Sequence, residues 1–321
     1  MTLPMMRAFL VIAALSCAIT ARAAESDFRV TLLGTASPSP RPDRFGPSTL
    51  VEAGSVKLLI DAGRGVPIRL WQMRVPMGQI DALLITHYHS DHVSGVPDVW
   101  LTGWLQPPFG QRKTPFYVIG PTGAKVLMEN LQRAYAADIK IRLADEKNPP
   151  EGIAVKVDEF SADGVVYEKG GVRVTAFEVD HGDVIKPAYG YRVDYGGRSA
   201  VISGDTRFNE NVIKYGTGAD LLIHELGAAK PELLKNPAMQ RIIDHHTTPR
   251  DVGRVFERAK PKLAVYTHIV RLSNATIPEP SLAEILAETR QNYSGPLVFG
   301  EDLMTFDITA GGVAVYRSGG P

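Results

Sequence analysis

Cysteine is almost absent from this chain, which contains a single one, Cys17, among 321 residues. It lies in an apolar run, Ala8–Ile19, that follows Arg7 and precedes the small-x-small triplet Ala21–Ala23. This arrangement is typical of a secretory signal peptide, here 1–23, with cleavage at its end. The chain that remains, which we expect to be periplasmic or secreted, would carry no disulfide, no thiolate metal ligand and no cysteine nucleophile.

An excess of charge of one sign is lacking as well. The sequence has 35 Lys+Arg and 35 Asp+Glu, and loss of Arg7 and Arg22 with the signal peptide would leave 33 basic residues against 35 acidic ones, a net charge of −2. Proteins that bind nucleic acid normally show a basic excess or stripe, so we expect no nucleic-acid partner. The run Ala8–Ile19 is short for a bilayer span of about 20 residues, so we expect no membrane association after cleavage, with a retained anchor as the alternative.

Strand-like and helix-like segments alternate along 24–321, and no low-complexity linker divides them. The composition, 44% hydrophobic and 22% charged, suits a globular protein with a large core. The expected strands are 28–33, 49–60, 80–85, 116–119, 152–160, 171–179, 189–195, 198–202 and 263–266. The expected helices are 66–73, 124–136, 248–259 and 279–292. We therefore expect one α/β domain over 24–321.

Histidine, by contrast, is concentrated. Three of the eight histidines and one carboxylate fall within six residues, His87–His92, directly after the expected strand Ile80–Ile85. A loop that leaves a sheet edge can aim its side chains into a cleft. Imidazole and carboxylate groups suit zinc, manganese or iron(II). Four such groups this close repel one another unless something binds them, so the cluster predicts a metal site.

Three further candidate ligands each follow an expected strand. They are His181, Asp205 and His268. Taken singly, each would be an ordinary loop residue. Their shared placement, together with the histidine cluster, predicts that they converge on one site.

These residues form an ordered, five-part pattern that resembles the metallo-β-lactamase superfamily, from Gly34 to about His268. The parts are His87-x-His89, Asp91-His92, His181, Gly204-Asp205-Thr206 and His268. The resemblance implies an α/β fold, an αβ/βα sandwich of two mixed β-sheets with helices on the outside. It also implies that two divalent metal ions lie at one edge of the sandwich.

The resemblance assigns the metal ligands in three groups. They are His87, His89 and His181 for one ion, Asp91, His92 and His268 for the other, and Asp205 as a bridge between them. Zinc is the expected metal, with manganese or iron(II) as alternatives. Two cations about 3.5–4 Å apart acidify a shared water toward hydroxide. Asp91 would also help to hold that hydroxide as a catalytic residue.

Features around the pattern narrow the branch of the superfamily. The lack of a cysteine ligand and the presence of Asp205 both argue against β-lactamases. The segments Asp220–Glu225 and His245–Pro249 resemble the ribonuclease Z and arylsulfatase-like branch. Members that process tRNA carry a long arm between the positions of His181 and Asp205, an interval that is short here. We therefore expect an arylsulfatase-like enzyme that does not process tRNA.

His246 matches the histidine of that branch that approaches the substrate. We expect it to act as a proton donor or oxyanion stabiliser. The alternative is that it faces solvent near a helix start capped by Thr247 or Thr248. His224 and Glu225 would orient a ligand imidazole, or else pack as a pair at the end of a strand.

Several residues near the metal motifs are candidates for contact with the substrate. Trp100 and Trp104, with Phe109, would wall a pocket for an aromatic leaving group, and packing in the core is the alternative. Arg207 would pair with a sulfate or phosphate oxygen, and a surface ion pair is its alternative. The turn Gly120–Gly123 before a helix is either an anion site or a plain strand-to-helix turn.

Together these features predict a secreted or periplasmic two-metal hydrolase of a small-molecule ester. An aryl sulfate ester is the first expectation and a phosphodiester the second. Lactones or β-lactams are the acyl alternatives. A non-catalytic metal-binding module is the alternative outside enzymes, and a homodimer is left open.

Overall fold

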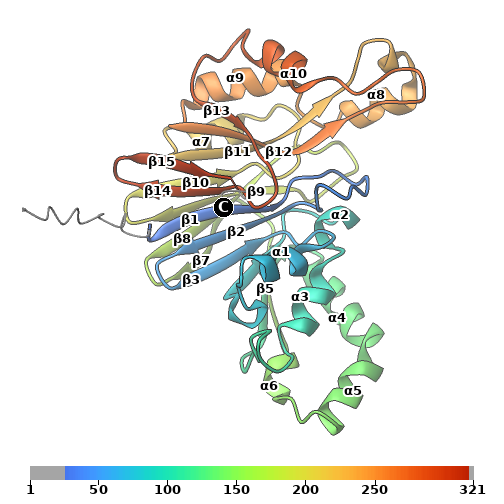
Figure 1. Cartoon of the computed structure of the whole chain (residues 1–321), viewed down its shortest axis with the longest axis vertical. Helices are drawn as coiled ribbons and strands as arrows, with labels where there is room; N and C mark the ends of the chain where they lie inside the picture. Colours follow the sequence, from blue (N-terminus) through green and yellow to red (C-terminus); the bar gives the residue numbers. More distant parts are fainter. Residues whose placement is uncertain (1–25, 318–321) are drawn as a thin grey trace, which may run out of the picture.

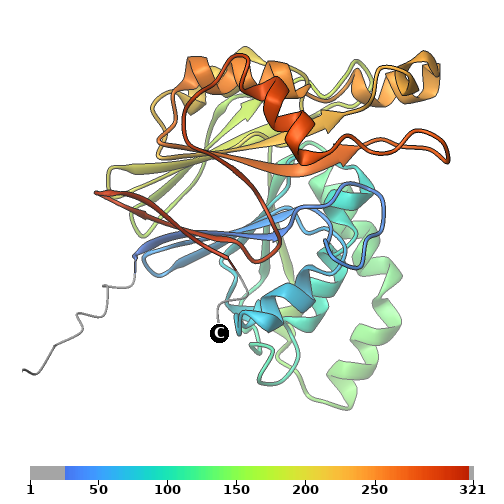
Figure 2. The same cartoon turned by 45° about the horizontal axis from the view of Figure 1, so that its top comes forward.

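The computed structural model describes residues 26–317. The signal peptide expected over 1–23 lies outside these residues, so its cleavage and the location of the protein stay predictions. Two mixed β-sheets pack face to face at the centre, and helices cover the outer face of each (Figures 1 and 2). The αβ/βα sandwich implied by the sequence is therefore confirmed. No helix between residues 26 and 317 is long and apolar enough to cross a membrane.

The first sheet has eight strands within the described residues. In spatial order they are β15 (Gly312–Tyr316), β14 (Thr305–Thr309), β1 (Phe28–Gly34), β2 (Ser48–Ala53), β3 (Val56–Ile60), β4 (Ala82–Leu84), β5 (Phe116–Pro121) and β6 (Val155–Phe160). From β3 to β6 the neighbouring strands run parallel, and the rest pair antiparallel. The parallel strands end at one edge, which is where the loop after β4 carries the histidine cluster.

The second sheet has seven described strands. In spatial order they are β13 (Leu297–Phe299), β12 (Leu263–Arg271), β11 (Leu221–Ala228), β10 (Arg198–Ile202), β9 (Tyr189–Tyr195), β8 (Val172–Glu178) and β7 (Gly164–Lys169). Strands β10 to β13 run parallel, and β7 to β10 pair antiparallel. Asp205 follows β10, and His268 lies within β12.

Helices cover the two outer faces. Beside the first sheet are α1 (Val66–Gln72), α2 (Ser90–Val93), α3 (Val96–Thr102), α4 (Ala124–Ala134), α5 (Ala136–Ala144) and α6 (Pro150–Ile153). Beside the second are α7 (Glu210–Gly216), α8 (Pro237–Ile243), α9 (Pro249–Ala259) and α10 (Leu282–Thr289). Two short 3₁₀ turns, Met77–Gln79 and Leu233–Lys235, complete the set.

The alternation of side chains along each strand explains this layering. Leu58 and Ile60 of β3 point into the core between the sheets, and Leu59 between them points to the helices of the first sheet. In the same way Ile223 of β11 faces the inner core, and Leu222 faces α7 and α9. Each such side chain contributes about 1.5–3 kcal/mol by leaving water. The central strands of both sheets are therefore buried on both faces, and the polar residues of the site lie in the loops after strands, in α2, and within β11 and β12.

Several expected elements differ from the structure. The strand expected over 49–60 is a hairpin of β2 and β3, because Gly54 adopts a φ of 57° and turns the chain. The helix expected over 279–292 begins only at Leu282. Ser281 caps it, and Pro280 disfavours helical backbone at Glu279. The elements that were not expected are strands β7, β11, β13, β14 and β15 and helices α2, α3, α5, α6, α7 and α8.

Candidate metal centre

The seven expected ligands meet at one edge of the sandwich, although they come from both sheets. The cluster lies in the loop after β4 and in α2 (Figure 1), whereas the other three ligands follow β8, follow β10 and lie in β12. Their donor atoms fall into groups in which all lie within 4.8 Å of one another. The groups are His87, His89, His181 and Asp205, then Asp91, His92 and His268, then Asp205, His246 and His268.

In the first group three imidazole nitrogens face one point. Nδ1 of His89 lies 3.1 Å from Nε2 of His87 and 3.2 Å from Nε2 of His181. Oδ2 of Asp205 lies 3.9 Å and 3.7 Å from the same two Nε2 atoms. Tetrahedral zinc with Zn–N bonds of about 2.0–2.1 Å separates its ligand atoms by roughly 3.3 Å. The spacing of these atoms suits such an ion.

The second group shares Asp205 with the first. Oδ2 of Asp91 lies 3.2 Å from Nε2 of His268 and 3.7 Å from Nε2 of His92. Oδ2 of Asp205 lies 3.3 Å from both of these nitrogens. The buried Nε2 of His92 makes no well-directed hydrogen bond within residues 26–317, even with Asp205 so near. A buried nitrogen without a partner is costly, and a cation between these atoms would satisfy it.

Burial sets the charge of the ligand side chains. It lowers the pKa of His181 to about 3 and holds the pKa of His87 well below its ordinary value. Burial opposes the charged form of Asp205, but His268 and His92 beside it lower the pKa of this carboxyl well below its usual range. Burial also opposes the charged form of His92, but Asp205 and Asp61 beside it raise the pKa of this imidazole well above its ordinary value. A divalent cation would have to displace the proton of His92, because metal ligands bind in their deprotonated form.

Asp61, at the end of β3, supports the ligands and was not expected from the sequence. Its Oδ2 accepts a hydrogen bond from Nδ1 of His92 at 2.7 Å, and its Oδ1 accepts one from the Thr86 amide at 2.8 Å. The Thr86 hydroxyl lies 2.8 Å from Asp61 and 3.0 Å from Nδ1 of His87. These bonds fix ring orientations, as carboxylates commonly do for metal-binding histidines. A carboxylate directly after the buried strand Leu58–Ile60 was the available signal.

His246 faces the same site and is held by Glu225. Its Nδ1 lies 2.9 Å from Oε2 of Glu225, whose Oε1 accepts the Thr247 amide at 2.7 Å. Its ring lies 5.6 Å from that of His268. Burial opposes the charged imidazole, but the adjacent Glu225 carboxylate raises the pKa of His246 above its ordinary value. The alternative that His246 merely faces solvent is wrong, since the side chain is buried beside the candidate ligands.

The pair His224 and Glu225 does not orient a ligand imidazole. Glu225 contacts His246 instead. Nδ1 of His224 donates to the Glu225 carbonyl at 2.7 Å, and its ring packs edge-on against Phe256. The backbone carbonyl of His245 lies 2.8 Å from Nδ1 of His181, so this residue holds a ligand through its main chain.

The expected aromatic substrate wall is wrong. Trp100 and Trp104 are both 0% exposed, in the core between the first sheet and its helices. Their indole N–H groups donate to the carbonyls of Ile153 and Pro149. Neither ring reaches a substrate, because both are enclosed in this core. Phe109 packs against Trp71 instead, with their ring centres 5.4 Å apart.

The two expected anion contacts are already occupied by the protein. Arg207 pairs with Asp180 at 2.8 Å and with Asp183 at 3.0 Å, which is the surface ion pair named as its alternative. At the start of α4 the Glu159 carboxylate accepts the amides of Gly123 and Lys125 at 2.8 and 2.9 Å. The turn before α4 therefore binds a side chain of the same chain.

Comparison with known proteins agrees with the fold and the site. Residues 57–269 match the family described as Beta-lactamase superfamily domain. Ribonuclease Z of Mycobacterium marinum is 34% identical over 284 residues, 88% of this chain and 99% of that protein. The metallo-β-lactamase fold protein YhfI of Bacillus subtilis aligns with a TM-score of 0.68 and 18% identity, over 87% of this chain and 98% of YhfI. The short form of human tRNase Z aligns with a TM-score of 0.64 and 23% identity, over 88% of this chain and 99% of that structure.

These relatives overturn the expected function. The M. marinum relative is a ribonuclease Z, so the expectation of an aryl sulfate or other small-ester hydrolase is wrong, and the expectation of no nucleic-acid partner is wrong as well. The short interval between His181 and Asp205 is not evidence against similarity to ribonuclease Z, because the alignment of this chain covers 99% of the M. marinum enzyme. The near-zero net charge was a poor guide to nucleic-acid binding, because a sum over the whole chain does not show where positive charges are grouped on the surface.

The sequence, the fold and the site of this chain all point to the same family. The family match covers residues 57–269, a ribonuclease Z matches most of the chain, and the two-sheet sandwich is that of the aligned structures. Clustered histidine and aspartate side chains lie where a metal ion is held by N and O donors. The chain belongs to the metallo-β-lactamase superfamily and is one of its metal-dependent hydrolases.

Proposed function

We propose that the protein is a two-metal phosphodiesterase that cleaves RNA. The likeness to ribonuclease Z along 88% of the chain supports RNA as the substrate class. The convergence of the ligand atoms on Oδ2 of Asp205, which lies 3.3–3.9 Å from four imidazole nitrogens, is the observation that carries the two-metal assignment.

The donor set fits two divalent cations, and we propose zinc. His87, His89 and His181 would hold one ion, and Asp91, His92 and His268 the other, with Asp205 between them. Imidazole and carboxylate donors suit zinc, and no thiolate is needed. When bound, such ions supply an acidified water as nucleophile and neutralise charge on the phosphate.

The side chains around the ions direct the proton transfers. Nδ1 of His246 is engaged by Glu225, which leaves Nε2 free to donate a proton to the leaving oxygen or to stabilise the phosphate oxygens. The Glu225 carboxylate, which raises the pKa of His246, favours the protonated ring that can donate this proton. A carboxylate oxygen of Asp91 can accept a hydrogen bond from the attacking water and aim it at phosphorus. No nucleophile from the protein is required.

Metal-dependent cleavage of an oligoribonucleotide tests the proposal. The protein is stripped with a chelator, reloaded with zinc or manganese, and assayed with an RNA of defined sequence, with nitrophenyl sulfate as a second substrate. We expect RNA cleavage only after reloading, loss of cleavage in Asp205→Asn, and no sulfate hydrolysis. Arg173→Ala, which removes a cation from an exposed pair with Glu168, is the matched control and should keep full activity. RNA left intact by the reloaded protein would overturn the proposal.

A further inference from the structure

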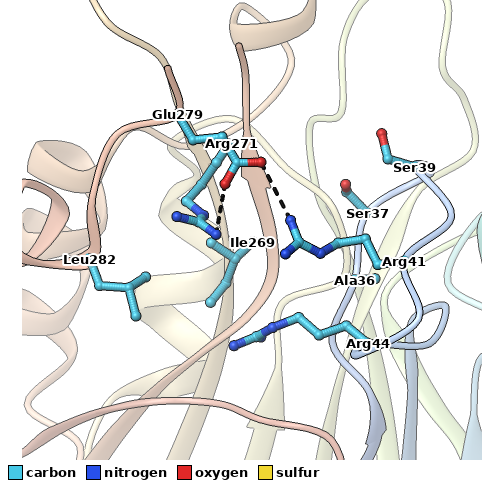
Figure 3. Close-up of a pocket in the computed structure, with 9 residues that line it drawn as sticks. All are labelled: Ala36, Ser37, Ser39, Arg41, Arg44, Ile269, Arg271, Glu279 and Leu282. Atoms are coloured by element: carbon cyan, nitrogen blue, oxygen red, sulfur yellow. Dashed lines mark hydrogen bonds and ion pairs between the residues drawn. The ribbon is translucent and has the colours of Figure 1, made fainter.

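A pocket rich in arginine adjoins the metal centre but has no place in the mechanism above. It is formed by Arg41, Arg44 and Arg271 around Glu279, and we call it the arginine pocket (Figure 3). It contains about 560 Å³ of empty space, including the solvent at its mouth. Ser37 and Ser39 line one side, and Ile269 lies at its base.

The chain places this pocket next to the metal centre. Ile269 directly follows the ligand His268, and its amide donates to the Thr35 carbonyl at 3.3 Å. Arg271 lies three residues beyond His268 along β12, which is about 10 Å at the rise of an extended strand. An anion at the pocket and a phosphate at the metal ions are therefore within reach of one extended polynucleotide.

The loop that carries Arg41 and Arg44 is fixed at both ends by Asp302. Its Oδ1 accepts the Thr35 amide at 3.0 Å, and its Oδ2 accepts the Phe45 amide at 2.7 Å. Arg44 spans the base of the loop, since its Nη1 donates to the Thr35 hydroxyl and to the Gly300 carbonyl, both at 2.9 Å. The arginines are thus held in place before any ligand arrives, which lowers the entropic cost of binding.

Positive charge exceeds negative charge in the pocket. Glu279 is shared by two guanidinium groups, with Arg271 at 2.8 Å and Arg41 at 3.4 Å, and Figure 3 shows its carboxylate between them. Asp43 pairs with Arg41 at 3.1 Å on the exposed side. Within residues 26–317 the remaining N–H groups of Arg44 have no acceptor. An adjoining hollow shares Arg41 and Arg44 and adds Arg64.

We propose that the arginine pocket binds a phosphate of the RNA strand beside the one cleaved at the metal ions. Glu279 is the internal anion that holds the arginines when RNA is absent. This inference rests on the proposed function. Guanidinium groups match phosphate oxygens with paired hydrogen bonds. The ion pairs of Glu279 are only partly buried and therefore screened by solvent, so a phosphate can displace the carboxylate.

Two substrates separate the pocket from the metal centre. Bis(nitrophenyl) phosphate carries only the phosphate that is cleaved, whereas an oligoribonucleotide carries its neighbours as well. Arg41→Ala and Arg271→Ala should each raise KM for the oligoribonucleotide by roughly 10–100-fold, the range for a hydrogen bond to a charged group. Neither should change KM for bis(nitrophenyl) phosphate. Arg271→Lys keeps the charge and should recover part of the loss, and Arg173→Ala is the matched control.

Binding measurements supply a second readout that does not need turnover. Affinity for a labelled, uncleavable 2′-O-methyl oligonucleotide is measured against salt concentration by fluorescence anisotropy. Loss of one phosphate contact should reduce the slope of log K against log salt by about 0.7. Arg271→Ala should show this reduction, and Arg173→Ala should not. Glu279→Gln should bind the oligonucleotide several-fold more tightly than the unchanged protein.

The outcomes distinguish failure of the pocket from failure of the proposed function. If the protein cleaves RNA but Arg41→Ala and Arg271→Ala behave like Arg173→Ala, the pocket assignment is overturned and the proposed function stands. If the protein cleaves neither substrate, the proposed function fails, and the anisotropy slopes decide the pocket alone. Inhibition of RNA cleavage by inorganic phosphate is measured as well. If phosphate inhibits the unchanged protein but not Arg271→Ala, and the two bind the oligonucleotide equally, the pocket binds the free ion and the RNA assignment is wrong.

Discussion

At the scale of single residues, carboxylates from distant parts of the sequence hold the imidazoles of the site in place. Asp61 and Glu225 act on His92 and His246, which lie 31 and 21 residues away in the sequence. Hydrogen bonds between such distant positions depend on the packing of the two sheets, and one sequence does not contain that information.

Asp205 is the residue on which the two-metal assignment depends. Asp205→Ala should lower the metal content from two ions per chain and abolish RNA cleavage, because both ions lose the same ligand oxygen. Elemental analysis of the purified protein measures the metal content, and circular dichroism confirms that the variant is folded. Two ions retained with full activity would remove Asp205 from its bridging position.

His246 should affect turnover without affecting the metals. His246→Ala should keep both ions and slow cleavage by roughly 10²–10⁴-fold, the usual size of a general acid–base contribution. Metal content and kcat, measured on the same preparation, check this. An unchanged kcat would exclude His246 from the proton transfers.

The pH dependence of cleavage follows from the contact of His246 with Glu225. An acid must be protonated to donate, so activity should be present below the raised pKa of His246 and fall as the pH rises through it. Glu225→Gln removes the carboxylate that raises this pKa, so the fall should move to lower pH. A pH profile of kcat for both proteins tests the shift. Identical profiles would show that another group controls the alkaline limb.

At the scale of elements, helix α9 positions the catalytic segment just before it. Thr248 caps the helix by accepting the Asp251 amide at 3.3 Å, and His246 and Thr247 directly precede the cap. The sequence predicted this helix and its cap closely, since both are local signals. It missed the hairpin of β2 and β3, and it left the burial of Trp100 as an alternative, because apolar periodicity alone does not show which surface covers a residue.

The cap gives a prediction about stability. Thr248→Ala should lower the free energy of unfolding by about 1 kcal/mol, the usual cost of losing an N-cap. Urea unfolding followed by circular dichroism measures the change. Thr309→Ala, in an exposed position of the edge hairpin β14–β15, is the comparison and should cost less. Equal stability of Thr248→Ala and the unchanged protein would show that the cap contributes little.

At the scale of the whole molecule, the site joins the two sheets. The loop after β4 and helix α2, beside the first sheet, carry four of the candidate ligands, and the second sheet carries His181, Asp205 and His268. These residues could be proposed from the sequence because their spacing and their place after buried strands are local features. The sequence implied this sandwich only through its resemblance to a family, since periodicity does not show how two sheets face each other. It gave no sign that arginines distant in sequence, such as Arg41 and Arg271, meet beside the site.

Ligands from both sheets predict that metal binding stabilises the fold. An ion present at 100 times its dissociation constant adds about 2.7 kcal/mol per site. For a chain of this size, removal by a chelator should lower Tm by roughly 4 °C for each ion. Differential scanning calorimetry, with Asp205→Ala as the comparison, measures this shift. Chelation should lower the Tm of the variant by less than the Tm of the unchanged protein. An equal drop in Tm for both proteins would place the stabilising ion elsewhere.

RNA cleavage measured against metal occupancy tests the central claim most directly. Metal-free protein is titrated with zinc, and cleavage of a defined oligoribonucleotide is followed at each ratio of zinc to protein. The account predicts that cleavage rises as the site fills and levels off at two ions per chain. Protein that holds two ions per chain but leaves the RNA intact would contradict it.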